Sequence, residues 1–309
     1  MTRKIENKLH VIMVISNPCE FQRRYYLAKE FIKHMEDTRD VILYIVEMVY
    51  LNQEYQITED GNPFHLQLKA NVPLWHKENM IDLGIKKLLP QNWKAVAWID
   101  ADVEFDNPNW ASDALKILNG SKDYIQLFSH CLDMDHDENT MSVFHSFGYQ
   151  YDKCRQYCAS GINYWHPGFA WAMTRKCYQK IGIFTWGILG AGDYHMAHAL
   201  IGVSNTIHED PSDGYRRKLE TLVKKSRSTR LGYCPGVIRH FFHGSKKNRK
   251  YMERWQILVN YKYDPFLHMK HDKNGVIVPS LNCPQGLLDD IMLYFCERME
   301  DEVSGSLVI

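Results

Sequence analysis

Nearly continuous apolar runs alternate with amphipathic segments along the first part of the chain. Residues 9–16 (LHVIMVIS) and 41–50 (VILYIVEMVY) consist almost entirely of apolar side chains. Such runs are typical of strands that are buried on both faces of a parallel sheet. Between them, residues 20–35 carry apolar side chains at helical spacing. The sequence therefore predicts that the fold opens with a strand, a helix and a second strand.

The alternation resumes after a polar, turn-rich stretch at residues 53–73, which we expect to form a loop or a hairpin. The next expected elements are a helix, a strand, a helix and a strand, at residues 80–89, 95–99, 108–118 and 123–128. This order predicts an α/β protein whose mainly parallel sheet is flanked by helices.

The pattern is weaker in the second half. Residues 129–165 are acidic and aromatic without clear periodicity, and we expect irregular chain there. The elements expected beyond are a strand, two helices, a basic helix, a strand, a helix, a hairpin turn and a last helix: residues 168–173, 174–181, 194–200, 212–230, 233–243, 246–261, 272–275 and 287–299. No internal repeat or clear linker is visible.

Composition narrows the classes of partner. The chain has 309 residues and 45% hydrophobic content, enough for a sizeable core. Its 37 basic residues balance 37 acidic ones, so no global field favours a nucleic acid or an anionic membrane. The apolar run at residues 9–16 is too short to span a membrane and lacks a signal-peptide cleavage site, so we expect a soluble, cytoplasmic protein. Eight scattered cysteines do not indicate a disulfide framework.

Two carboxylates, Asp100 and Asp102, follow the expected strand at residues 95–99. Residues two apart on an extended chain point the same way, so both side chains should leave the sheet together. Paired oxygens at the carboxyl edge of an α/β sheet suit Mg²⁺ or Mn²⁺, and such an ion suits the phosphates of a ligand. The sequence therefore predicts a metal and nucleotide site here.

Four further polar residues have a functional and a structural interpretation. Glu47 interrupts an apolar strand and is either a strand end that reaches solvent or an acceptor for a base or ribose. Lys77 at a helix start faces a diphosphate or solvent. Asp193 follows a glycine-rich turn and either caps a helix or receives a close ligand. His243 precedes Gly-Ser and the basic helix start at Lys246, so it could supply a nitrogen ligand beside phosphate contacts.

Two clusters have a mainly structural interpretation. The acidic run at Asp133, Asp135, Asp137 and Glu138 is typical of a solvated loop rather than a metal site. Cys154 and Cys158 are spaced for one helical turn and could bind zinc, but no second pair of ligands lies near them in the sequence.

The order of the motifs is more specific than any one of them. Their sequence, LWHKENMIDLGIKKLLP with WIDADVEF, then GFAWA to GAGD, then HFFHGSKKNRKYMERW, resembles nucleotide-sugar glycosyltransferases of the GT-A fold. The resemblance is strongest to family-two-like enzymes of bacteria, phages and large DNA viruses. It covers about residues 9–261 and implies a GT-A domain at 1–261, with a nucleotide-binding half (1–128), an acceptor-binding half (129–261) and a C-terminal extension at 262–309.

The resemblance implies a role for each matching residue. Asp102 is expected to ligate the metal directly, and Asp100 to contact the ribose or a metal-bound water. His243 is the expected third ligand, preferred over His240 because it directly precedes Gly-Ser. Asp193 is the expected general base. The remaining implied contacts are to the nucleotide at Asn17, Glu47 and Lys77, to the leaving phosphate at Lys246 and Arg249, and to the acceptor at Trp165, His166 and Trp171.

Two implied roles are open. Trp171 has core packing as an equal alternative. Asp82 stands where the resemblance leads us to expect Asn, which puts a polar contact from that position in doubt.

The expected activity is transfer of a sugar from a nucleotide diphosphate donor, with UDP as the first candidate, to a hydroxyl of a glycan, protein or small molecule. The cofactor would be Mn²⁺ or Mg²⁺, the outcome inversion, and the location the cytoplasm, that of the host if the protein is viral. One alternative is a sugar-phosphate nucleotidyltransferase, but residues 17–20 lack its glycine-rich basic loop. The other is a non-catalytic sugar-binding protein.

Overall fold

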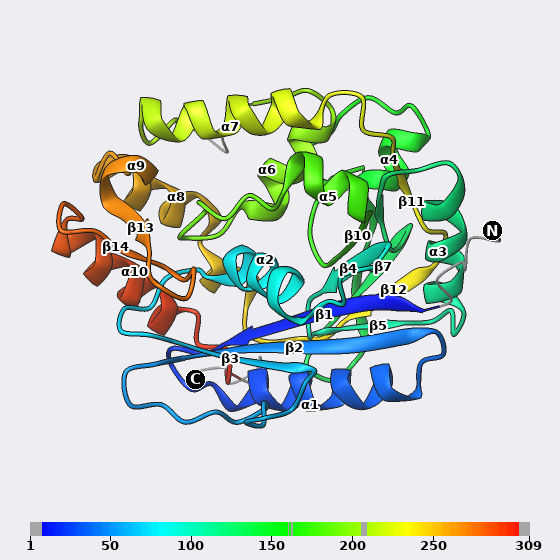
Figure 1. Cartoon of the computed structure of the whole chain (residues 1–309), viewed down its shortest axis with the longest axis horizontal. Helices are drawn as coiled ribbons and strands as arrows, with labels where there is room; N and C mark the ends of the chain where they lie inside the picture. Colours follow the sequence, from blue (N-terminus) through cyan, green and yellow to red (C-terminus); the bar gives the residue numbers. More distant parts are fainter. Residues whose placement is uncertain (1–7, 160, 162, 205–208, 303–309) are drawn as a thin grey trace, which may run out of the picture.

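The large sheet of the fold has seven strands and only one of them, β10, runs antiparallel to its neighbours. The computed structural model of the chain describes residues 8–159, 161, 163–204 and 209–302 (Figure 1). In spatial order the strands are β11 (Leu231–Tyr233), β6 (Tyr124–Gln126), β10 (Ala170–Thr174), β4 (Ala95–Ile99), β1 (Leu9–Ser16), β2 (Val41–Tyr50) and β3 (His65–Ala70). The predicted class, a mainly parallel α/β sheet flanked by helices in one domain, is confirmed.

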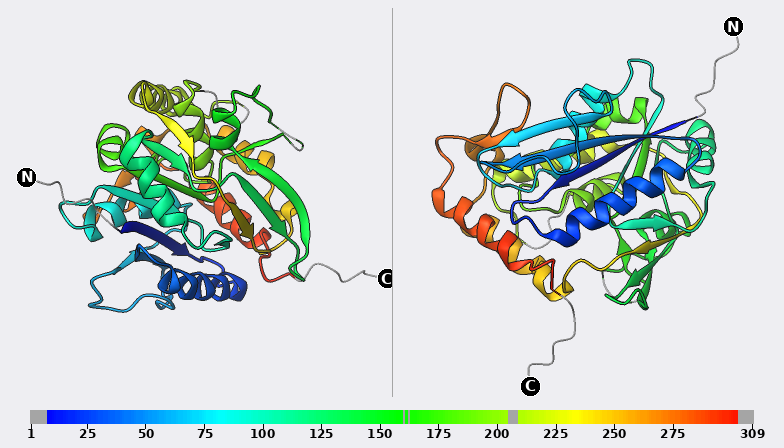
Figure 2. Two further views of the ribbon diagram at one scale, coloured as in Figure 1. Left: turned by 90° about the vertical axis from the view of Figure 1, so that its right-hand side faces the viewer. Right: turned by 90° about the horizontal axis from the view of Figure 1, so that it is seen from below.

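Helices cover both faces of this sheet because its strands alternate apolar side chains between two cores. On one face Val11 and Ala97 pack with α1 (Gln22–Asp37) and α3 (Trp110–Gly120). On the other face Ile12 and Trp98 pack with the remaining helices, of which α2 (Lys77–Leu88) lies directly over β1 and β2. Figure 2 shows α1 running along the strands on its face of the sheet.

A second sheet contradicts the irregular chain that we expect at residues 129–165. Its spatial order is β5 (Val103–Phe105), β12 (Val237–His240), β7 (His130–Met134), β8 (Thr140–Ser146) and β9 (Trp165–His166). A short helix, α4 (Phe147–Asp152), follows β8. Asp133 is part of β7 and is 2% exposed, so the expectation of a solvated loop is wrong for this residue. The stretch at 53–73 is mainly loop but ends in the edge strand β3.

The other helices lie where the sequence predicts them, with small differences at their ends. They are α5 (Arg175–Ile181), α6 (Gly192–Leu200), α7 (Asp213–Ser226), the 3₁₀ helix η1 (Lys246–Arg249) and α8 (Tyr251–Asn260). The single helix expected at 246–261 is divided because Lys250 has a left-handed backbone conformation, with a φ of 40°. Thr174 caps α5 as predicted, accepting a hydrogen bond from the backbone N–H of Cys177.

The C-terminal region consists of α9 (Pro265–His268), the hairpin β13 (Met269–His271) and β14 (Ile277–Pro279), and α10 (Gln285–Glu297). The hairpin docks on α2 through Asn79, whose amide donates to the carbonyl of Gly275 and accepts from the N–H of Ile277. Helix α10 packs against α8. Across the described residues, every helix is too short or too polar to cross a bilayer.

Candidate metal centre and adjoining acidic site

Asp100 and Asp102 lie in the turn that carries the chain from the large sheet to the second sheet. The N–H of Asp100 donates to the carbonyl of Phe169, and the carbonyl of Asp102 accepts from the N–H of Phe241. Strand β12 pairs with β5 so that His240 lies opposite Val103. The C-terminal end of β12 is therefore held beside the turn between β4 and β5.

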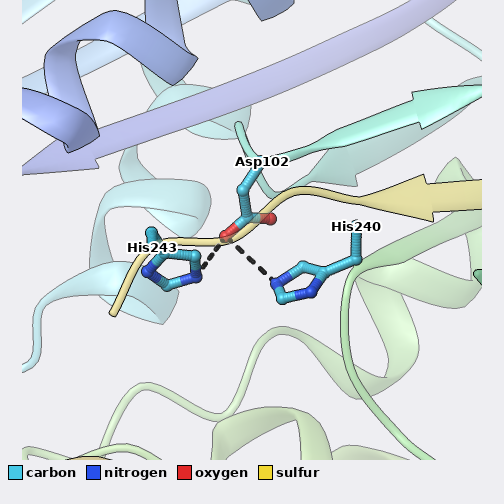
Figure 3. A group of neighbouring side chains, drawn as sticks. All are labelled: Asp102, His240 and His243. Carbon is cyan, nitrogen blue, oxygen red and sulfur yellow. Dashed lines mark ion pairs between the residues drawn. The ribbon is translucent and has the colours of Figure 1, made fainter. Parts of the chain in front are cut away.

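This pairing brings Asp102, His240 and His243 together (Figure 3). The carboxylate of Asp102 points between the two rings, with Oδ2 at 2.9 Å from Nε2 of His243 and 3.7 Å from Nε2 of His240. One ligand atom from each residue lies within 4.8 Å of the others. Among the described residues it is the one group of three or more acidic, His or Cys side chains with this geometry.

Two atoms of the group lack hydrogen-bond partners although they are buried. They are Oδ1 of Asp102 and Nε2 of His240. Buried polar atoms without partners are costly, and both atoms belong to the group whose ligand atoms lie within 4.8 Å of one another, so an ion bound by this group would satisfy them. Two imidazole nitrogens and one carboxylate oxygen suit a divalent transition ion such as Mn²⁺ and leave coordination positions open. The residues present therefore fit a metal.

The imidazole of His240 also has a carboxylate at its other nitrogen. Asp133 lies 2.7 Å from Nδ1 of His240, and Lys246 pairs with the other oxygen of Asp133. Burial would lower the pKa of His240, but Asp102 and Asp133 outweigh it and raise that pKa. Burial likewise opposes, but does not prevent, the fall of the Asp102 pKa to well below its usual range beside the two imidazoles.

Arg249 lies against the same centre. Its Nη2 is 2.8 Å from Nε2 of His243, and its Nε is buried without a hydrogen-bond partner. An arginine that faces an imidazole rather than a carboxylate has no anion to balance its charge, which suits an anionic ligand. Lys246, in contrast, is engaged by Asp133.

Asp100 points to a different cluster from Asp102 because the chain turns after Ile99 and is no longer extended. It pairs with Lys77 at 2.6 Å, and the same ammonium contacts Asp193 at 3.0 Å. All three side chains retain some exposure to solvent, between 16% and 25%. Burial and the charges of Asp193 and Asp102 raise the pKa of Asp100 to about 6, with Lys77 opposing them. The structure thus brings Asp193 to the edge of the predicted site.

Asp193 lies in the first turn of α6 but does not cap it, since the capping position is Ala191. The preceding turn needs glycine at position 192 because the side chain of Glu78 packs directly against its backbone. A Cβ on Gly192 would lie 2.3 Å from the carboxyl group of Glu78. Burial and the charge of Asp193 raise the pKa of Glu78 to about 8. Three carboxyl groups therefore share the neighbourhood of one ammonium.

Asn17 and Glu47 form hydrogen bonds that hold loops at the ends of β1 and β2. The amide of Asn17 closes a turn by accepting from the N–H of Phe21 and donating to its carbonyl. Glu47 is 2% exposed, so it does not reach solvent. Its oxygens accept from the N–H groups of residues 56–58 and from the hydroxyl of Thr58.

The three aromatic residues proposed for the acceptor differ in placement. Trp171 is 2% exposed inside the large sheet, and its indole N–H donates to the carbonyl of Pro167, as the core-packing alternative requires. Trp165 is buried against Tyr157. His166 stacks on Phe169 at 4.5 Å, and burial lowers its pKa to about 3.

Asp82 accepts hydrogen bonds from Tyr178 and Lys86, at 2.7 Å and 2.6 Å. Its side chain is therefore used within the fold.

The sequence predicts His243 as a ligand, but it does not predict His240 or Asp133 as part of the same centre. His240 is the third member of the group. The sequence feature that could have predicted it is HFFH at residues 240–243, which places two histidines near the end of one strand. Asp133 had no signal beyond its position in an acidic run. Cys154 and Cys158 join no group of potential ligands among the described residues.

No family model matches the chain, and no curated protein sequence matches it. Solved structures with a similar arrangement include the catalytic domain of Drosophila β1,4-galactosyltransferase 7 in complex with xylobiose, at 9% identity and a TM-score of 0.41, over 92% of this chain and 98% of that chain.

A mannosyltransferase of Pyrobaculum calidifontis, in complex with GDP-Man and Mn²⁺, matches at 13% identity and a TM-score of 0.43, over 81% of this chain and 60% of that one. TarS of S. aureus matches at 11% identity and a TM-score of 0.43, over 94% and 71%. Similarity this distant carries no functional argument.

Proposed function

We propose that this protein is a metal-dependent glycosyltransferase that moves a sugar from a nucleotide diphosphate, with UDP as the first candidate, to an acceptor hydroxyl. The observation that carries the proposal is the junction of two clusters at one turn. A buried group with metal-ligand chemistry surrounds Asp102, and a partly exposed acid, Asp193, joins it through Lys77 and Asp100.

Sugar transfer breaks the bond between the anomeric carbon and a phosphate oxygen, so the departing diphosphate gains negative charge. Asp102, His240 and His243 would hold a divalent ion, Mn²⁺ or Mg²⁺, that stabilises this charge when bound. The mixed nitrogen and oxygen donors favour Mn²⁺ of the two. Arg249 adds a guanidinium with an unpartnered Nε beside that ion site. Lys246 would assist if a phosphate drew it from Asp133.

On the other side, a carboxylate must take the proton of the acceptor hydroxyl. Asp193 is our candidate for this general base, and direct attack with one base predicts inversion. Lys77 contacts both Asp193 and Asp100, and its charge offsets the repulsion between them. Asp100 would then contact the ribose or a metal-bound water from its position beside Lys77.

We further infer a GT-A arrangement of the family-two-like type, with a nucleotide half at residues 1–128, an acceptor half at 129–261 and a cytoplasmic location. The motif order supports this inference. Asn17 and Glu47 would shape the nucleotide pocket through the loops that they hold. Trp165 and His166 would border the acceptor.

Two alternatives are less well supported. A nucleotidyltransferase normally places a glycine-rich basic loop after the first strand, whereas residues 17–20 form a turn closed by Asn17. A protein that only binds sugar needs no general base, so the joint presence of Asp193, Asp100 and the group around Asp102 and His243 argues against the second alternative.

The deciding experiment incubates the purified protein with Mn²⁺ and a panel of nucleotide sugars, and follows hydrolysis and melting temperature. One sugar nucleotide should be hydrolysed slowly and should raise the melting temperature only when Mn²⁺ is present. A response to a nucleoside triphosphate with a sugar phosphate would identify the first alternative instead, and a response to free glycan alone the second.

Substitution of the base completes the test. Asp193→Asn should lower transfer by about 10² to 10⁴-fold while the donor still raises the melting temperature. Asp60→Asn, on an exposed loop, is the matched control and should leave transfer unchanged. Normal transfer by Asp193→Asn would remove the base assignment, and a product with the donor's anomeric configuration would refute inversion.

A further inference from the structure

The segment after α10 returns to the metal centre from the C-terminal region. Glu300 lies in this segment, is 2% exposed, and has Oε2 at 3.6 Å from Nδ1 of His243. Two guanidiniums hold the same carboxylate. Arg24 of α1 donates to both of its oxygens, at 2.8 Å and 2.5 Å, and Arg298 donates to Oε1 at 2.5 Å.

The arrangement around His243 repeats the one around His240. In both rings Nε2 is directed to Asp102, while Nδ1 faces a buried carboxylate, Glu300 for His243 and Asp133 for His240. A neutral imidazole carries one proton, and an anion at Nδ1 favours that proton on Nδ1. The lone pair of Nε2 is then the one directed into the group, where a metal would bind it; at His243 the metal would take the place of the Arg249 contact. The distance of 3.6 Å is too long for a direct hydrogen bond, so Glu300 acts on the ring of His243 through its charge.

We propose that Glu300 is the positioning residue for His243, so that the C-terminal segment is part of the metal centre rather than packing alone. The proposal rests on the metal site of the proposed function but not on transfer chemistry. Arg24 supports this role because it also donates to the carbonyl of Ser16 at the end of β1. The carboxylate is thereby tied to the sheet that also carries Asp102.

The chain provides a matched control at the next residue. Asp301 anchors the same segment to the start of α1, where its oxygens accept from the N–H groups of Gln22 and Arg23. Asp301→Asn therefore weakens the docking of the segment without removing a carboxylate from His243. A difference between the variants at 300 and 301 separates positioning of the ring from general attachment.

The experiment measures Mn²⁺ affinity at pH 7 from the EPR signal of the free ion, without any nucleotide. Loss of a carboxylate behind a ligating imidazole costs about 10 to 100-fold in metal affinity. We expect about a tenfold loss for Glu300→Gln, a similar loss for Asp133→Asn, and a change within about twofold for Asp301→Asn. Equal losses at 300 and 301 would overturn the proposal.

A double-substitution cycle separates positioning from stability. If Glu300 acts through His243, Glu300→Gln should weaken Mn²⁺ binding in the wild-type protein but add less than about twofold to His243→Ala. Full loss in both backgrounds would show a structural role and reject the proposal. If the melting curve shows that Glu300→Gln does not fold, Glu300→Asp is used instead. It keeps the negative charge but moves it away from His243 by one methylene. We expect the same coupling for it.

The outcomes also separate this proposal from the proposed function. A wild-type protein that does not bind Mn²⁺ would overturn the positioning role. Coupling between residues 300 and 243 in a protein that uses no sugar nucleotide would support the positioning role and reject transfer. Transfer with additive effects in the cycle would retain the function and reject the role of Glu300.

Discussion

Glu78 is a buried carboxyl group in a cluster with too few cations, and its substitution should stabilise the protein in a pH-dependent way. Burial and the nearby charge of Asp193 raise its pKa from 4.5 to about 8. The folded state therefore keeps Glu78 neutral at pH 7, while the unfolded chain ionises it. Glu78→Gln replaces the neutral acid with an uncharged group of the same shape.

The sign follows from linkage. A group whose folded pKa is raised contributes stability that is fully present below pH 4.5 and is lost as the pH rises through about 8. The difference of about 3.5 pH units corresponds to about 5 kcal/mol, an upper limit because Asp193 and Lys77 share the charge. At pH 7 the raised pKa of Glu78 lowers the free energy of unfolding of the wild-type protein by about 3 kcal/mol. Gln carries no such cost, so the variant should gain stability over wild type as the pH rises.

The assay is urea unfolding of wild type and variant at pH 5, 7 and 9, without metal. The free energies of unfolding should differ little at pH 5 and should diverge in favour of Glu78→Gln at pH 7 and 9. Glu54→Gln is the control, since Glu54 is exposed and should give parallel curves. A constant difference between Glu78→Gln and wild type at all three pH values would refute the reasoning.

Three further predictions concern other parts of the chain. Gly84→Ala should destabilise the protein by about 1–3 kcal/mol in urea unfolding, because a Cβ there would lie 2.8 Å from Val46, whereas Gly120→Ala meets open space and should not destabilise it. Oxidation with diamide should link Cys19 to Cys296, whose sulfurs are 3.6 Å apart, as a cross-linked peptide in mass spectrometry of the monomer. His240→Ala should abolish the rise in melting temperature with Mn²⁺, and an undiminished rise would exclude this ligand.

The central strands could be predicted to the residue because their signal is local. β1 and β2 have the predicted bounds, since both faces of each strand are buried and nearly every side chain is apolar. Glu47 is the one charged residue in these two strands. A charge within such a strand needs partners, and it finds them in the N–H groups of the loop that follows.

The second sheet could not be predicted because its signal is not local. β7 contains Asp133, a charge that argues against a buried strand when the segment is read alone. The burial of this carboxylate is compensated by His240 and Lys246, which lie more than a hundred residues further along the chain. A buried acid in a strand can be predicted only when the residues that pair with it are known, and here those residues are distant in the sequence.

Asp100 and Asp102 do not point the same way, contrary to what the sequence predicts for two residues on an extended chain, because distant residues also determine their directions. Each carboxylate points to the group with which it pairs, Asp100 to Lys77 and Asp102 to His243. The two remain linked, because the charge of Asp102 is one of the causes that raise the pKa of Asp100. A cation at Asp102 would remove that repulsion, favour the ionised form of Asp100 and strengthen its pairing with Lys77. The metal centre and the site around Asp193 would then respond to each other through one turn of the chain.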